Sequence, residues 1–143
     1  MLILNYTQTL DKEHTMLEEQ TINPELLRRA DNESPIVRYQ VAINPNTPVY
    51  LLQKLAEDES ENVRYRVARN PNTPATGLKK LADDKVYFVR YEAASNPRTP
   101  ADLLEKLADD EDPEVRSAVI ERAKELADTD FAAYITAIAK SYD

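Results

Sequence analysis

The side chains that could carry chemistry in this sequence are mainly carboxylates, and they gather in short acidic turns. Residues 57–59 (EDE) and 109–112 (DDED) are two such turns. A calcium loop of the EF-hand type needs alternating oxygen ligands, a Gly at its sixth position and a closing Glu, and neither turn supplies that Gly. Paired carboxylates can perform acid–base catalysis, but their adjacency says little in a chain with 26 acidic residues. We interpret the turns as a solvated acidic ridge and predict neither a metal site nor catalytic residues.

Other common chemistries are excluded by composition. The chain has no Cys, which excludes disulfides, thiolate metal sites and cysteine nucleophiles. His14 is the single histidine, so a His-rich metal site is excluded and little is left for a serine triad. One Gly in 143 residues leaves no glycine-rich loop to cradle a phosphate. No cofactor is predicted.

The overall charge narrows the classes of partner. The chain has 26 Asp and Glu against 18 Lys and Arg, a net charge of −8, whereas binding to a nucleic-acid backbone needs clustered positive charge. No apolar run approaches the roughly 18 residues that a membrane span needs. The opening MLILNYTQTL lacks the basic region of a secretory signal. We expect a cytoplasmic monomer that binds neither nucleic acid nor membrane.

The elements that position these side chains repeat every 26 residues. The chain reads NPNTP at 44–48 and 70–74 and NPRTP at 96–100, in units that begin at Val37, Val63, Val89 and Val115. The end units lose this motif, as expected where a stacked array meets water. The prediction is a single domain over 1–143, with an arm (1–10), an N-terminal capping unit (11–36), three regular repeats (37–62, 63–88, 89–114) and a C-terminal capping unit (115–143).

Each unit reads as two short helices joined by the proline motif. Val37 and Val41 lie one turn apart, and the helix that holds them must end at Asn44, because the residue before a proline leaves the α region. Thr47 is expected to cap the second helix and Pro48 to occupy its first position.

The second helix carries a buried stripe at Leu52, Leu55 and Ala56. Ser34–Pro35 and Asp112–Pro113 are predicted to be further helix starts of the same kind. Two helices of about 8–10 residues cannot bury their apolar faces alone, so the units must stack. The predicted fold is an all-α solenoid of five two-helix repeats.

The string VRxxVAxNPNTPxxLLxxLAxD resembles the leucine-rich repeat variant family, a relative of HEAT and armadillo solenoids. In the first regular unit, the residues that match this string are Val37-Arg38, Asn44-Pro45, Thr47-Pro48, Leu52, Leu55-Ala56 and Asp58, and each has a counterpart 26 residues later. The resemblance implies a right-handed superhelix of alternating α and 3₁₀ helices, and it brings no reaction with it. The iron–sulfur domain of the founding member cannot carry over, because the chain has no Cys.

An acidic residue precedes an Arg by six positions at Asp58–Arg64, Asp84–Arg90 and Asp110–Arg116, as in HEAT repeats. We interpret these arginines as structural forks that tie down the turns between helices. A binding role for them is the alternative.

Functional positions should vary while the repeat frame stays fixed. If Val37 and Val41 face the core, position 39 and its equivalents point away from it, and these are Tyr39, Tyr65, Tyr91 and Ser117. By the HEAT resemblance, the helix that carries VR lines a concave surface. The predicted partner-binding residues are Tyr39, Tyr65, Tyr91, Gln40, Arg66, Arg69 and Glu92, since Tyr and Arg anchor protein interfaces. The alternative is that the tyrosines only pack between units.

The second regular unit departs from the frame. Gly77 replaces a Leu, and residues 86–88 (VYF) replace polar residues. These changes could form a pocket or a partner patch. The interpretation favoured by the sequence is a local repacking in which Phe88 fills core space at the position of Ile36.

Three functions remain open from the sequence. The first is a non-catalytic module that binds a protein or peptide along the tyrosine-lined groove. The second is an enzyme on a HEAT-like scaffold, such as a chromophore lyase or a DNA glycosylase, which would need a pocket with a placed acid. The third is a structural spacer.

Overall fold

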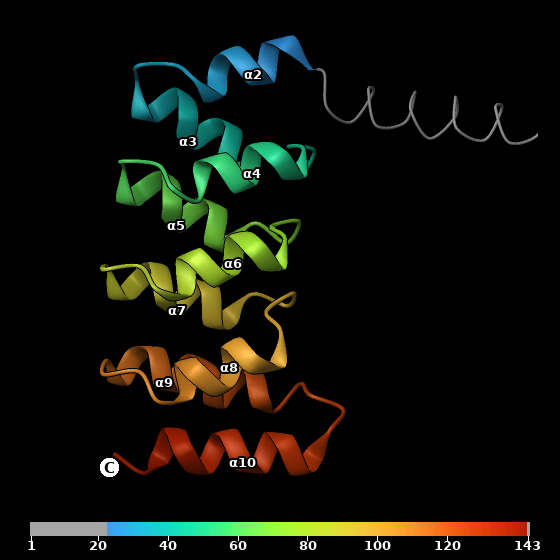
Figure 1. Cartoon of the computed structure of the whole chain (residues 1–143), viewed down its shortest axis with the longest axis vertical. Coiled ribbons are helices and arrows are strands. Elements are labelled where there is room, and N and C mark those ends of the chain that lie inside the picture. Colours follow the sequence, from blue (N-terminus) through green and yellow to red (C-terminus); the bar gives the residue numbers. More distant parts are fainter. Residues whose placement is uncertain (1–22, 143) are drawn as a thin grey trace, which may run out of the picture.

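The computed structural model describes residues 23–142. Within that range every regular element is a helix, which confirms the all-α prediction. The helices are α2 (Pro24–Ala30), α3 (Pro35–Ile43), α4 (Val49–Leu55), α5 (Glu61–Arg69), α6 (Ala75–Ala82), α7 (Tyr87–Ser95), α8 (Ala101–Ala108), α9 (Pro113–Ala123) and α10 (Thr129–Lys140). They stack along the long axis of the molecule (Figure 1), an arrangement consistent with an α-solenoid.

The helices form two layers. In one layer α3, α5, α7 and α9 each pack against the next, and in the other α4, α6 and α8 follow one another (Figure 1). The first layer is the more closely packed of the two, and α10 covers α8 and α9 at the C-terminal end. Two clusters of buried aliphatic residues run between the layers, one around Leu52 and Leu55 and the other around Leu104 and Leu107.

The proline motifs end and start helices largely as predicted. Asn44, Asn70 and Asn96 close α3, α5 and α7 in an extended conformation, each directly before a proline. Pro35 and Pro113 occupy the first turns of α3 and α9. The helices that carry the VR pair are α-helices, so the alternation with 3₁₀ helices implied by the family resemblance is not observed at these positions.

The threonines of the motif do not cap the second helix, so that prediction was wrong. Pro48 is the N-cap of α4, and no side chain caps the helix. The hydroxyl of Thr47 instead donates to the carbonyl of Val41, 2.5 Å away, and Thr73 does the same to Val67. The buried hydroxyl thus adds a second donor to a carbonyl at the end of the preceding helix, which also accepts the backbone N–H of Asn44 in the first unit and of Asn70 in the second.

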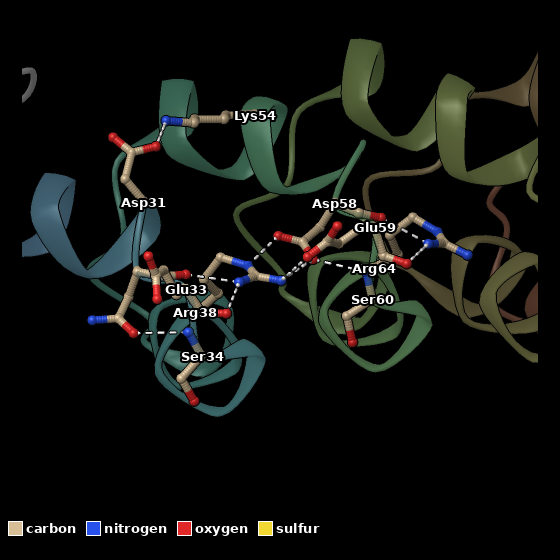
Figure 2. Close-up of polar contacts among 10 residues, drawn as sticks. Asp31, Glu33, Ser34, Arg38, Lys54, Asp58, Glu59, Ser60 and Arg64 are labelled. Carbon is tan, nitrogen blue, oxygen red and sulfur yellow. Dashed lines mark hydrogen bonds and ion pairs between the residues drawn. The ribbon is translucent and has the colours of Figure 1, made fainter.

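The buried arginines hold the turns, as predicted, but through different partners (Figure 2). Arg38 donates from Nη1 to the backbone carbonyls of Asn32 and Glu33, and its Nε donates to the Asp58 carboxylate at 2.7 Å. The carboxylate partner is therefore the acid 20 residues after the Arg, while the residue six before it offers its carbonyl. Arg64–Asp84 and Arg90–Asp110 repeat this pairing.

Buried asparagines connect consecutive units through their side-chain amides. Asn70 donates to the carbonyl of Ala42 at 2.8 Å, and Asn96 donates to the carbonyl of Ala68 at 2.7 Å. Each bond runs from the end of one VR helix to the end of the preceding one. The asparagine of the motif therefore ends its own helix and also joins it to its neighbour.

The second regular unit is rearranged at its surface. Ile36 is 68% exposed, so its repeat position is not core space in the N-terminal unit, whereas Phe88 at the same position is repacked toward the core, as the sequence predicted. Phe88 is half-buried and packs against the first core cluster. A Cβ at Gly77 would stand 3.2 Å from Cγ2 of Thr73, so the missing side chain leaves little open space.

The end units are covered unequally by the structure. The arm 1–10 and residues 11–22 of the predicted N-terminal capping unit, His14 among them, lie outside the described residues, and the described part of that unit, 23–36, holds α2 and the start of α3. At the other end α9 and α10 form a helix pair without the proline motif. The predicted count of five units therefore stays a prediction, as does the right-handed superhelix.

Candidate functional site

The three predicted tyrosines lie on successive helices of the more closely packed layer. Tyr39 is on α3, Tyr65 on α5 and Tyr91 on α7, and all three are half-buried. Tyr39 and Tyr65 pack against the first core cluster, and Tyr91 packs against the second. The three tyrosines thus contribute to packing and remain partly exposed to solvent.

Arg66 joins the first two tyrosines. Its guanidinium carbon lies 4.7 Å from the centre of the Tyr39 ring and 5.3 Å from that of Tyr65. Such distances allow cation–π attraction, which is worth about 0.5–2 kcal/mol depending on solvent exposure. Its Nε atom is buried and has no hydrogen-bond partner. The guanidinium of Arg66 therefore stacks on two rings, while its Nε–H group makes no hydrogen bond.

Arg69 extends this cluster along α5. Its Nη1 donates to the hydroxyl of Tyr65 at 3.2 Å, and this hydrogen bond, together with the nearby charge of Glu92, raises the pKa of Arg69 above its ordinary value. The guanidinium is exposed at the surface. The arrangement places two cations, one stacked and one free to bind an anion, beside two aromatic rings.

The remaining predicted residues lie at the edges of this cluster. Gln40 accepts a hydrogen bond from Nη2 of Arg29 at 2.5 Å, so its amide is engaged with α2. Glu92 follows Tyr91 on α7 and is half-buried. The structure thus brings Tyr39, Tyr65, Arg66 and Arg69 together, with Gln40, Tyr91 and Glu92 on either side. We call the four central residues the tyrosine–arginine face.

Sequence reasoning missed a pocket beside this face. It has a volume of about 400 Å³ and lies between the N-terminal ends of α3 and α5. Its lining residues are Pro35, Ile36, Tyr39, Ser60 and Asn62. The available signal was the apolar Ile36, whose position the sequence placed in core space but which is exposed in the structure.

A larger concavity of about 1170 Å³ lies between the α6–α7 turn, α8 and α10. Carboxylates dominate its lining, and two of them, Asp84 and Asp110, are held by Arg64 and Arg90. Tyr134 donates to Glu105 at 2.9 Å, which raises the pKa of Tyr134 above its ordinary value. The buried acids of this cleft are thus committed to structural ion pairs.

Neither a metal-binding cluster nor a membrane-spanning helix is found within residues 23–142. No group of three or more His, Cys, Asp or Glu side chains there is arranged to hold a metal ion. None of the helices in the same range has both the length and the apolar character that a bilayer crossing requires.

Comparison with known proteins bears on one unit directly. The model of the leucine rich repeat variant family matches residues 87–112, which run from the first residue of α7 to the turn before α9. This confirms the resemblance predicted from the sequence, to a HEAT-like helical repeat family. No curated protein and no solved structure matches the chain.

In the matched unit, residues 87–112, the buried residues that hold the repeat differ from those at the surface. Arg90, Asn96 and Thr99 are buried and bond to backbone carbonyls or to Asp110. In contrast, Tyr91 and Glu92 reach the surface beside the tyrosine–arginine face. The frame residues are thus occupied in holding the repeat, whereas Tyr91 and Glu92 stay partly exposed on α7.

Proposed function

We propose that the chain is a non-catalytic repeat scaffold that binds a protein or peptide partner along the outward side of α3, α5 and α7. The observation that carries this proposal is the position of Arg66 between the rings of Tyr39 and Tyr65. Tyrosine and arginine are enriched among the residues that anchor protein interfaces, because they offer large contact areas and directed hydrogen bonds.

The packing of the layers supports a concave position for this face. In a curved array the helices on the inner side lie closer together than those on the outer side. The layer of α3, α5, α7 and α9 is the more closely packed one, and it carries the tyrosine–arginine face. An extended peptide along this layer would cross several helices and contact each of them.

The leucine rich repeat variant family is a repeat-scaffold family, commonly protein-binding and generally non-catalytic, which favours binding over the enzyme alternative. The acidic cleft at α8 and α10 would be the place for catalysis, but its buried carboxylates are paired with arginines. The proposal includes a cytoplasmic monomer without a nucleic-acid or membrane partner, in keeping with the net charge of −8.

The test is affinity capture from the native cell extract with three forms of the full chain. The wild type is compared with Arg66→Glu/Arg69→Glu, which reverses both cations of the face. Lys79→Glu/Lys85→Glu is the matched control: these exposed lysines lie on α6 and in the α6–α7 turn, and the change in net charge is the same. Circular dichroism checks that each variant keeps its helical content.

A protein retained by the wild type and the control but lost from the face variant supports the proposal. Equal recovery by all three forms places the working surface elsewhere. Equal loss from the control and the face variant shows that net charge, rather than this face, determines binding.

A further inference from the structure

The pocket beside Tyr39 has an equivalent one unit later, and there it is filled. Moving each of the five pocket residues forward by 26 positions gives Glu61, Asn62, Tyr65, Val86 and Phe88. The two polar residues of the first pocket, Ser60 and Asn62, thus become apolar in the second. Val86 and Phe88 both pack against the first core cluster.

Phe88 shows how an aromatic ring sits in this place. Its ring centre lies 5.8 Å from that of Tyr65, with the ring planes at 73°, an edge-to-face contact. Such aromatic pairs contribute beyond the area that they bury. Opposite Tyr39, the equivalent position is occupied by the exposed, polar Asn62, and a pocket of about 400 Å³ remains.

The charges around the pocket are uneven along α5. Glu61 lies at its N-terminal end, next to Asn62, whereas Arg66 stacks on the lining residue Tyr39 and Arg69 follows one turn later. A partner that enters the pocket would therefore meet two cations as it runs toward the C-terminal end of α5. Carboxylates are the side chains that such guanidinium groups bind best.

Building on the proposed function, we infer that the partner is a peptide segment that inserts an aromatic side chain between α3 and α5. The ring packs edge-to-face on Tyr39, as Phe88 packs on Tyr65, and a neighbouring Asp or Glu of the peptide pairs with Arg66 or Arg69. The chain thus contains, one unit away, an internal copy of the contact that its partner makes.

The experiment uses the full chain and short capped peptides followed by NMR titration. The probes are acetyl-Gly-Gly-Phe-Asp-Asp amide and its reversed sequence, with versions in which Ala replaces Phe or Lys replaces Asp. Wild-type signals from the pocket residues Tyr39 and Asn62 are expected to shift with the Phe–Asp peptides. Replacing Phe by Ala, or Asp by Lys, is expected to weaken binding about tenfold.

The decisive variant is Asn62→Phe, which places in the first pocket the residue that fills the second. We expect this variant to bind the Phe–Asp peptides at least tenfold more weakly while the chain remains folded, because the new ring copies the packing of Phe88. Glu114→Phe is the matched control, since residue 114 is the same repeat position in α9. It adds the same exposed ring without touching the pocket, and binding should be unchanged.

Full-strength binding to Asn62→Phe, or equal affinity of the Phe and Ala peptides, overturns the inference. Equal affinity of the Asp and Lys peptides overturns its acidic part. If Asn62→Phe does not fold, the wild-type shifts decide, and shifts confined to residues outside the pocket overturn the inference. If the peptide results overturn the inference but affinity capture of a partner still depends on Arg66 and Arg69, the proposed function is supported without the inference.

Discussion

Arg64 is a buried cation that bonds to two different turns of the chain. It donates from Nε and Nη2 to the carboxylate of Asp84, and from Nη1 to the carbonyl of Asp58. The side chains of Arg64 and Asp84 are 9% and 6% exposed. Removing the carboxylate would leave a guanidinium in a place where water cannot replace its partner.

We expect Asp84→Ala to lower the free energy of unfolding by about 3 kcal/mol, the usual cost of breaking a buried ion pair from one side. Urea denaturation measures this change. Asp31→Ala is the control, because Asp31 and its partner Lys54 are both about half exposed. Such surface pairs contribute at most about 1 kcal/mol. Equal costs for the two variants would show that the buried arginines do not hold the turns.

Tyr134 gives a pH-dependent prediction at the alkaline end. Its hydrogen bond to Glu105 raises its pKa in the folded state, so the fold holds the phenol proton more tightly than the unfolded chain does. The resulting stabilisation is fully present below the ordinary pKa of about 10 and is lost as the pH rises through the raised folded value. The phenolate absorbance of Tyr134→Phe is subtracted from that of the wild type, and the difference measures the ionisation of Tyr134 alone. In Glu105→Gln, the titration should move to lower pH, and an unchanged midpoint would contradict the assignment.

The residue scale also shows where sequence reasoning stops. The role of the arginines as turn clamps followed from their place beside acidic turns. The ion-pair partner did not follow, because Arg64 lies on α5 and Asp84 in the turn after α6, and the two meet only through the packing of α5 against α6. In the same way Tyr39 and Arg66 come from different units, so their contact depends on the spacing between helices.

At the scale of elements, the start of α6 combines a buried hydroxyl with a buried glycine. Thr73 donates to Val67, and its Cγ2 methyl lies 3.2 Å from the place of a Cβ on Gly77. Alanine inside a helix is about 1 kcal/mol more favourable than glycine, but here the methyl opposes it.

We therefore expect Gly77→Ala to change stability little on its own and to add about 1 kcal/mol in a Thr73→Ser background. Serine keeps the hydroxyl that bonds to Val67 and removes the opposing methyl. Urea denaturation of the four combined variants measures the coupling between the two positions. If Gly77→Ala has the same effect in both backgrounds, the methyl of Thr73 is not what opposes a side chain at position 77.

The ends of the helices were predictable where proline determines them. Asn44 leaves the α region because Pro45 follows it, and this rule acts through local sterics alone. Thr47 was misassigned because its hydroxyl has two local uses, accepting from the next helix or donating to the previous one. The choice depends on how tightly the two helices fold back on each other, which the motif itself does not encode.

At the scale of the whole molecule, α10 is the cover of the C-terminal end. Ile135 is fully buried against the second core cluster, whereas Ala133, on the same helix, is exposed. Ile135→Asp should undock α10, lower the free energy of unfolding by about 3 kcal/mol or more and expose apolar surface that binds a hydrophobic dye. Ala133→Asp adds the same charge on the outer side and should leave both measurements unchanged. Matching behaviour of the two variants would contradict the capping role of α10.

The period of 26 residues predicted the stacked layers, because each helix pair is too short to bury its apolar face alone. The pocket beside Tyr39 could not be predicted in the same way. It arises where Ser60 and Asn62 stand in the places of Val86 and Phe88, and whether such a difference leaves a space depends on how the side chains around it settle.

The hydrogen bond from an asparagine side-chain amide to the preceding unit would let the length of this protein change by one whole unit at a time. Asn96 bonds to the carbonyls of Ala68 and Asn70, and one unit earlier the same places hold Ala42 and Asn44. A gene lacking the codons for residues 61–86 would thus present Asn96 with partners of the same type and produce a shorter folded array. A deletion of half that length would leave Asn96 out of register with these carbonyls. The shortened protein would also bring Phe88 opposite Tyr39, and so close its own pocket.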